Sequence, residues 1–220
     1  MKGRMLLINF KNYLEASGDR ALGLARAAER VSEELEAEIV VAPPLPFLAL
    51  VARSVSIPVY SQHTDCAKPG STTGHMVAEV EKSAGARGSI VNHSERRLDI
   101  DCIRQVVEKL RELGMVSVVC ARTPDEVSRI SELRPDYVAI EPPELIGTGI
   151  AVSKAKPEVI KDSLNAIKGD VKLLCGAGIV GYEDVKKAVE LGAEGVLVAS
   201  GIVKAKDWER AIRDLVEPIK

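Results

Sequence analysis

Three residues of this chain have side chains that together suit proton-transfer chemistry: Lys11, His93 and Glu141. Each lies at or directly after the end of an apolar run. An ammonium group, an imidazole and a carboxylate suit the abstraction of a proton next to a carbonyl without a metal. Glu141 would take the proton, and His93 and Lys11 would stabilise the charge on the enediolate oxygens. Each residue also has a purely structural alternative: Glu141 could be a carboxylate paired with a neighbouring base, His93 a core histidine, and Lys11 a solvated lysine.

Small residues at two further positions favour an anion site. These are Gly176-Ala177-Gly178 and Ala199-Ser200-Gly201, each after an apolar run. Small residues let backbone N–H groups approach a phosphate closely, and a short helix beginning at 199–201 would add its dipole. Tight turns alone would also explain the glycines. The presence of small residues at both positions favours phosphate.

The elements that must position these residues follow a regular alternation. Eight apolar runs rich in Val, Ile and Leu do not alternate apolar with polar residues, which is typical of parallel strands buried on both faces. We predict strands at 5–10, 38–42, 58–62, 88–92, 116–120, 137–141, 172–176 and 195–199. We predict helices at 20–36, 47–54, 77–84, 101–113, 124–133, 157–168, 182–191 and 207–216.

Eight strands that are each followed by a helix predict an α/β fold, a closed (β/α)8 barrel that forms a single domain over residues 1–220. An open doubly wound sheet is the alternative. Against it, Asn9-Phe10-Lys11 follows the first strand, where a Gly-x-Gly-x-x-Gly turn would be expected. In such a barrel the active site lies at the carboxyl ends of the strands, which is where the candidate residues stand.

Composition excludes several classes of function. Thirty Lys and Arg against thirty-two Asp and Glu give a net charge of −2, which leaves no basic excess for nucleic acid. The longest apolar run, 39–52, contains three prolines and does not predict a membrane span. The first apolar run, 5–10, is too short for the core of a signal peptide. We therefore expect a soluble, cytoplasmic protein.

The cysteines and histidines do not predict a metal centre or a disulfide framework. The four cysteines are scattered, at positions 66, 102, 120 and 175, with no Cys-x-x-Cys pair. The one grouping that resembles a metal site is His63, Asp65, Cys66 and His75, but it lacks the regular spacing of zinc ligands. We expect these to be partly buried polar residues at a strand end.

Motifs at four of the predicted strand ends resemble a known family. They are Asn9-Phe10-Lys11, Asn92-His93-Ser94-Glu95-Arg96-Arg97, Glu141-Pro142-Pro143-Glu144-Leu145-Ile146-Gly147-Thr148-Gly149 and Cys175-Gly176-Ala177-Gly178. They resemble triosephosphate isomerase, in its shorter archaeal form. The resemblance runs essentially from end to end, with the motifs in the family's order.

The resemblance implies interconversion of dihydroxyacetone phosphate and D-glyceraldehyde 3-phosphate through an enediolate, in glycolysis and gluconeogenesis, without a cofactor. Glu141 matches the family's base and His93 its electrophile. Asn9 and Lys11 match the pair that contacts substrate, with Phe10 between them in the same substrate-binding motif. Glu95 matches a carboxylate that holds the lysine.

The resemblance also implies a phosphate side and a lid. Residues that match the phosphate contacts are Ile146, Gly178, Ala199 and Ser200, and residues 142–149 match the lid. Longer relatives have Tyr-Gly-Gly-Ser after the seventh strand, with hydroxyls that latch the lid. Here Cys175-Gly176-Ala177-Gly178 lacks those hydroxyls.

Residues 70–75 resemble the family's intersubunit loop, although His75 replaces its usual acidic residue. A homodimer or homotetramer is therefore expected, in which Thr73 reaches toward the partner's Lys11.

Two other classes of function remain open. One is a different phosphate-binding barrel enzyme, such as an aldolase that forms a Schiff base through Lys11 or Lys172. The other is a module that binds sugar phosphates without catalysis. Trapping with borohydride would reveal the first, and an isomerase assay would separate both from an isomerase.

Overall fold

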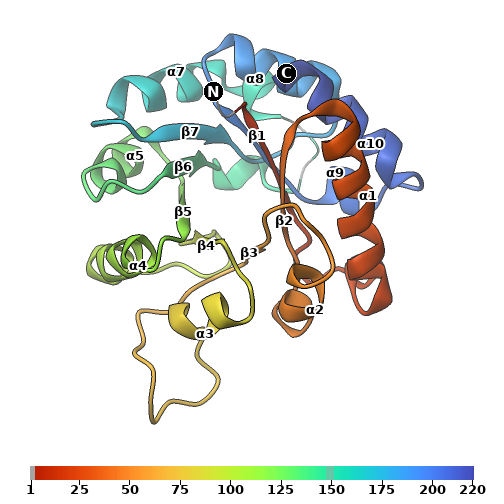
Figure 1. Ribbon diagram of the computed structural model, residues 1–220. Helices are drawn as coiled ribbons and strands as arrows, with labels where there is room; N and C mark the ends of the chain where they lie inside the picture. The colour runs from red at the N-terminus through yellow and green to blue at the C-terminus, as the bar shows by residue number, and fades with distance from the viewer. Residues whose placement is uncertain (1–2, 148, 150) are drawn as a thin grey trace.

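A ring of eight parallel strands forms the centre of the molecule (Figure 1). The structure is a computed structural model that describes residues 3–147, 149 and 151–220. The strands are β1 (Met5–Asn9), β2 (Glu38–Ala42), β3 (Tyr60–Ser61), β4 (Gly88–Val91), β5 (Val116–Ala121), β6 (Tyr137–Ile140), β7 (Lys172–Cys175) and β8 (Gly195–Val198). Their order is β2-β1-β8-β7-β6-β5-β4-β3. A parallel bridge between Val41 and Val59 joins the two ends of this sheet and closes the barrel.

Helices lie outside the ring of strands (Figure 1). They are α1 (Asp19–Leu35), α2 (Leu48–Ala52), α3 (Ala78–Ser83), α4 (Ile100–Glu112), α5 (Pro124–Ser131), α6 (Val152–Ala155), α7 (Pro157–Ala166), α8 (Tyr182–Glu190), α9 (Ser200–Val203) and α10 (Trp208–Val216). Short 3-10 turns lie at Leu14–Ala16, Leu45–Phe47, Pro143–Leu145 and Glu217–Ile219. No described helix is long and apolar enough to cross a bilayer.

The predicted (β/α)8 barrel is confirmed, and the predicted strands and helices are all present, with boundaries that shift by a few residues at most. The largest difference among the strands is in β3, which includes only two of the five residues predicted for it. The helix α6 was not predicted, because four residues are too few to show a helical period.

The apolar runs are buried on both faces, as parallel strands inside a shell of helices must be. In β1, Leu6 and Ile8 belong to the layer between strands and helices. Met5 and Leu7, which alternate with them, belong to the cluster that fills the barrel interior. Because both faces are packed, the ends of the strands are where polar side chains can face a cavity.

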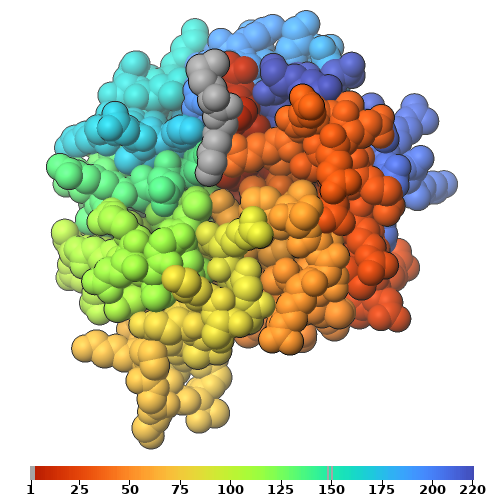
Figure 2. Space-filling model, in the orientation of Figure 1, coloured from red at the N-terminus to blue at the C-terminus, as the bar shows by residue number. Residues whose placement is uncertain are grey.

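An arm between β3 and α3 projects from the body of the molecule (Figure 2). Its base is closed by a hydrogen bond from the Asp65 N–H to the Met76 carbonyl, at 2.8 Å. Residues 70–75 are exposed.

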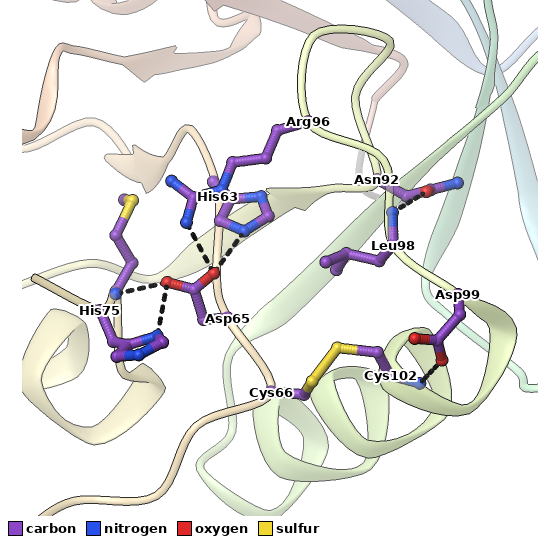
Figure 3. Close-up of a disulfide and its surroundings, with 10 residues drawn as sticks. His63, Asp65, Cys66, His75, Asn92, Arg96, Leu98, Asp99 and Cys102 are labelled. Atoms are coloured by element: carbon purple, nitrogen blue, oxygen red, sulfur yellow. Dashed lines mark hydrogen bonds and ion pairs between the residues drawn. A yellow bond between two sulfur atoms is a disulfide. The ribbon is translucent and has the colours of Figure 1, made fainter. Parts of the chain in front are cut away.

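A disulfide between Cys66 and Cys102 joins the base of this arm to the first turn of α4 (Figure 3). The two residues are 36 positions apart, and their Cα atoms are 5.4 Å apart. The expectation of no disulfide was therefore wrong. Cysteine spacing does not report which distant segments the barrel brings together. Cys120 and Cys175 are buried free thiols.

The disulfide should contribute measurably to stability. Replacing both Cys66 and Cys102 by serine should lower the free energy of unfolding by about 3 to 4 kcal/mol, because the unfolded chain gains loop entropy. Denaturant titration with and without a dithiol reductant measures this. The reductant should destabilise the parent chain and leave the double variant unchanged. Equal stability of the oxidised parent and the variant would contradict the expectation.

A buried carboxyl group, Glu81, lies under the arm. The Thr64 hydroxyl is 2.6 Å from Glu81 Oε2 and 2.8 Å from the Ser89 hydroxyl, which donates to the Ile90 carbonyl at 3.0 Å. A protonated Glu81 can donate to Thr64 and start a continuous chain of donors. Burial raises the pKa of Glu81 to about 7, although the hydrogen bond from Thr64 acts in the other direction.

The raised pKa predicts a pH-dependent stability. The folded state holds the Glu81 proton up to about pH 7, whereas the unfolded chain loses it near pH 4.5. Stability should therefore fall as pH rises from about 4.5 to 7. Glu81→Gln mimics the protonated form, so it should remove this decline and stabilise the protein at pH 8 by on the order of 2 to 3 kcal/mol. Denaturant titrations across this range test it, and parallel curves for parent and variant would refute it.

Candidate active site

The carboxyl ends of the strands enclose a cavity of about 60 Å³. The predicted residues that line it are Asn9, Lys11, His93, Glu141, Ile146, Gly178, Ala199 and Ser200. They come from the ends of β1, β4, β6, β7 and β8, or the segments that follow them. A wider cleft of about 580 Å³ adjoins it, shares Asn9, Lys11 and His93, and includes Glu95.

The turn after β1 places Asn9 and Lys11 at this rim. Asn9 Oδ1 accepts a hydrogen bond from the Lys11 N–H at 2.9 Å. Lys11 has a φ of +47°, and its carbonyl accepts a hydrogen bond from the Gln62 side chain at 3.0 Å. The backbone of the lysine is thus fixed from both sides, while its side chain lines both cavities.

Two other predicted residues are placed differently. The Phe10 side chain is fully buried in the layer between strands and helices, so it does not line either cavity. Glu95 lines the cleft, but no ion pair joins it to Lys11 in the described part of the chain. Its backbone N–H instead donates to His93 Nδ1 at 3.2 Å.

The turn that carries His93 is held by its neighbour Asn92, which has a φ of +61°. The Asn92 side chain donates to the Cys120 carbonyl and accepts from the Leu98 N–H, both at 2.9 Å. Arg97 donates to the Asn92 carbonyl at 3.3 Å and pairs with Glu126 at 2.7 Å. These bonds fix the histidine backbone relative to β5, to α5 and to the segment that precedes α4.

The hydrogen bond at Nδ1 defines which nitrogen of His93 faces the cavity as a donor. An Nδ1 atom that accepts a backbone hydrogen bond has no proton, so the proton of a neutral imidazole is on Nε2. His93 Nε2 lies 3.8 Å from Glu141 Oε2. A hydrogen-bond donor and a carboxylate therefore face each other across a gap.

Glu141 is anchored by its backbone N–H, which donates to the Ala121 carbonyl at 2.8 Å. Its side chain is 7% exposed, and Oε2 is buried without a hydrogen-bond partner among the described residues. Cys120 lies beside it: burial, together with the Glu141 carboxylate, raises the pKa of that thiol. The sequence placed Cys120 at a strand end but gave no signal that it contacts Glu141.

Gly176 leaves the space that the Glu141 side chain occupies. A Cβ atom at position 176 would lie 2.4 Å from Glu141 Cγ and 2.9 Å from Oε1. The glycine therefore sets how closely the carboxylate can pack against the end of β7.

The segments after β7 and β8 pack tightly on each other on the opposite side of the cavity. Ala177 and Gly178 have φ values of +57° and +73°, which bend the chain sharply after β7. A Cβ atom on Gly201 would lie 3.0 Å from the Ile179 carbonyl oxygen and 3.3 Å from Val180 Cα. A displacement of one segment would therefore move the other.

Residues 142–149, which match the lid, begin with the 3-10 turn Pro143–Leu145. Ile146, Gly147 and Gly149 line the small cavity. Glu144 also pairs with Lys156, which directly follows α6. Thr148, which belongs to the predicted lid, lies outside the described residues.

The remaining candidate residues lie elsewhere. Lys172 begins β7 at the opposite end of the barrel, where its ammonium group is 5.6 Å from the Tyr137 ring centre. It lines a separate cavity of about 1020 Å³. It therefore cannot serve as a nucleophile in the site at the carboxyl ends of the strands.

The grouping that resembles a metal site is an ion-pair network. Asp65 accepts from His63 at 3.1 Å and from Arg96 at 2.8 Å, and lies 3.6 Å from His75 (Figure 3). Burial alone would raise the pKa of Asp65, but hydrogen bonds from the Met76 N–H and His63 hold it below its ordinary value. Burial lowers the pKa of His63. The described residues contain no cluster suited to a metal ion.

A family model described as triosephosphate isomerase matches residues 4–215. The chain belongs to the triosephosphate isomerase family. It is 50% identical over 216 residues to a triosephosphate isomerase of Methanocaldococcus jannaschii, covering 97% of this chain and 99% of that one. It is 51% identical over 222 residues to one of Caldivirga maquilingensis, covering 100% and 99%. The resemblance inferred from the motifs is confirmed.

The fold agrees with that of a solved triosephosphate isomerase of Bartonella henselae. The TM-score is 0.73 over 96% of this chain and 98% of that chain, at 23% sequence identity. This comparison supports the barrel fold.

Gly176→Ala tests the packing of Glu141 in this family member. The added methyl group should displace the carboxylate, so kcat should fall by at least about tenfold, while inhibition by inorganic phosphate stays the same. Steady-state kinetics measure both quantities. Gly3→Ala is the control, because a Cβ atom there meets nothing within 4 Å. A kcat within twofold of the parent would show that the glycine does not set the carboxylate position.

Proposed function

We propose that this chain, as a triosephosphate isomerase, uses Glu141 as its base and His93 as its electrophile. The reaction interconverts dihydroxyacetone phosphate and D-glyceraldehyde 3-phosphate, a step of glycolysis and gluconeogenesis. The observation that carries the assignment concerns Glu141 Oε2, which is buried, has no hydrogen-bond partner in the described part of the chain, and lies 3.8 Å from His93 Nε2. A base and a donor at this separation can act on neighbouring atoms of one small substrate.

In the proposed mechanism, Glu141 removes a proton from the carbon next to the carbonyl. The electron pair moves to the carbonyl oxygen and forms the enediolate. His93 Nε2 donates its proton to the former carbonyl oxygen and takes up the proton of the neighbouring hydroxyl, whose oxygen becomes the new carbonyl. The protonated Glu141 then returns its proton to the former carbonyl carbon. The chemistry needs no cofactor, since no electrons leave or enter the substrate.

Lys11 and Asn9 are proposed to complete the catalytic side. Lys11 lines the same cavity as Glu141 and His93, so its ammonium group can stabilise the negative charge of the enediolate. Asn9 holds the Lys11 backbone and faces the same cavity. For Glu95, the hydrogen bond to His93 Nδ1 supports a role in orienting the imidazole.

The substrate phosphate is proposed to bind at Ile146, Gly178, Ala199 and Ser200, which line the side of the cavity formed after β6, β7 and β8. Small residues at 177–178 and 199–201 give a phosphate close access to backbone N–H groups. A lid over residues 142–149 would exclude water. Exclusion matters because an enediolate beside a phosphate can eliminate it and form methylglyoxal.

A homo-oligomer and a cytoplasmic location are proposed with the same function. The arm at 70–75 projects from the body, and the cleft of about 580 Å³ beside Lys11 has the exposed Leu45 at its edge. The arm of a second copy is proposed to enter this cleft. Both a homodimer and a homotetramer satisfy this contact, and sedimentation analysis would separate them.

The two alternatives are less well supported. An aldolase would require Lys11 as the Schiff-base nucleophile, and borohydride in the presence of substrate should then modify it. A module that only binds sugar phosphates would not need a carboxylate and an imidazole that face each other across the cavity, as Glu141 and His93 do.

Glu141→Gln is the direct test of the proposed base. It should lower kcat by about 10² to 10⁴-fold or more, because the amide cannot accept the substrate proton, while inhibition by a phosphate analogue persists. A coupled isomerase assay measures turnover. Glu158→Gln, at an exposed position on α7, should match the parent. Turnover above a tenth of the parent value in Glu141→Gln would remove Glu141 from this role.

A further inference from the structure

A buried carboxylate in the first turn of α8, Asp184, joins parts of the chain that meet beside the cavity. The Asp184 side chain is 4% exposed. Oδ2 accepts hydrogen bonds from the Val180 N–H at 3.0 Å and the Gly181 N–H at 3.2 Å. Oδ1 lies 2.6 Å from the Lys154 ammonium group on α6. Both carboxylate oxygens are therefore occupied by donors from two segments.

The first of these segments forms a wall of the proposed phosphate pocket. Residues 177–180 line the small cavity, and Asp184 holds their carboxyl end through Val180 and Gly181. The contact of Gly201 with Ile179 and Val180 then transmits their position to the turn that begins α9. A hydrogen bond that holds the Val180 backbone therefore restrains residues 177–178 and, through Gly201, residues 199–201.

The second segment is α6, which follows the proposed lid. Besides the Lys154 pair, the Ser153 hydroxyl, which is buried, donates to the Asp184 carbonyl at 2.9 Å. The Val152 N–H faces the Ala177 carbonyl at 3.4 Å. The helix α6 is thus joined both to Asp184 and to the segment that Asp184 holds.

A helix cap alone does not account for this arrangement. The two backbone bonds are those of a capping residue, and they would satisfy donors near the start of α8. The Lys154 pair and the bond from Ser153 to the Asp184 carbonyl add a partner that the helix does not require. Charge-assisted bonds of a buried carboxylate are stronger than neutral ones and hold geometry more firmly.

We propose that Asp184 is a positioning residue for the isomerase reaction. It holds residues 177–181 against α6, so that the wall that receives the phosphate and the end of the lid keep a fixed relation. Asp184 touches neither the reacting carbon atoms nor the phosphate in this arrangement. The inference rests on the proposed phosphate pocket, and its test has to separate the two.

The test compares Asp184→Ala with Asp184→Asn. Alanine removes the acceptor for Val180 and Gly181, so the inhibition constant of inorganic phosphate and KM should rise by about tenfold, with a smaller fall in kcat. Asparagine retains an oxygen that accepts both N–H groups, so it should restore phosphate inhibition to within about threefold of the parent. Steady-state kinetics with phosphate as inhibitor measure these values.

Lys154→Met tests the connection to α6. It leaves the bonds to Val180 and Gly181 in place, so phosphate inhibition should stay within twofold of the parent. Release of methylglyoxal per turnover should rise, because the lid loses part of its fixed end. Chemical assay of methylglyoxal against isomer formed measures this ratio. An unchanged ratio would show that Asp184 positions only residues 177–181, and it would overturn the part of the proposal that concerns α6.

Two controls separate positioning from stability and from the pocket assignment. Lys186→Gln removes a charge from an exposed position on the same helix that takes part in none of these contacts, and it should match the parent. Ser200→Glu should weaken phosphate inhibition by charge repulsion if the pocket is correctly placed. If Ser200→Glu has no effect, the pocket assignment is wrong. If Ser200→Glu does weaken phosphate inhibition, but folded Asp184→Ala has the same inhibition constant for phosphate as the parent, the inference about Asp184 is wrong.

Folding of the alanine variant is checked by its thermal unfolding midpoint. If Asp184→Ala does not fold, the asparagine and Lys154 variants decide the question. Asp184→Asn with parent-like phosphate inhibition, together with raised methylglyoxal release in Lys154→Met, would support the proposal. A tenfold loss of phosphate inhibition in folded Asp184→Asn would show that the acceptor geometry does not explain the effect, and would overturn it.

Discussion

Closure of the parallel ladder is the constraint on which the rest of this molecule depends. Every strand runs in the same direction, so every strand ends at the same rim. The bridge between Val41 and Val59 turns an open sheet into a ring, and residues from the ends of β1, β4 and β6 then face one another. Lys11, His93 and Glu141, which are far apart in the sequence, share one cavity for this reason.

Backbone hydrogen bonds do most of the positioning at that rim. His93 is oriented by the Glu95 N–H, Asn9 holds the Lys11 N–H, and Asp184 holds the N–H groups of Val180 and Gly181. Backbone groups sit on rigid elements and cannot rotate away, as long side chains can. The Glu141 carboxylate, by contrast, has one buried oxygen without a hydrogen-bond partner among the described residues, which suits its proposed role as a proton acceptor.

The fold and the residues of the cavity could be predicted because both depend on local sequence. Apolar runs mark buried strands, and the motifs stand where those runs end. The Cys66–Cys102 disulfide, the contact of Cys120 with Glu141 and the bonds of Asp184 depend on which distant segments touch, and residue spacing does not report that. Phe10 shows a different limit of the sequence. A motif identifies a segment, but the alternation of side chains along the chain decides which of them face the cavity, and Phe10 faces the helices.

The disulfide also has a topological consequence for the arm. Residues 66–102 form a covalently closed loop that contains the arm, α3, β4 and the turn with His93. A protease that cuts the exposed residues 70–75 would cut inside this loop. The two pieces of the chain would therefore stay linked, and the nicked molecule would separate into fragments only after reduction. A break in this exposed stretch therefore leaves the two parts of the chain covalently joined.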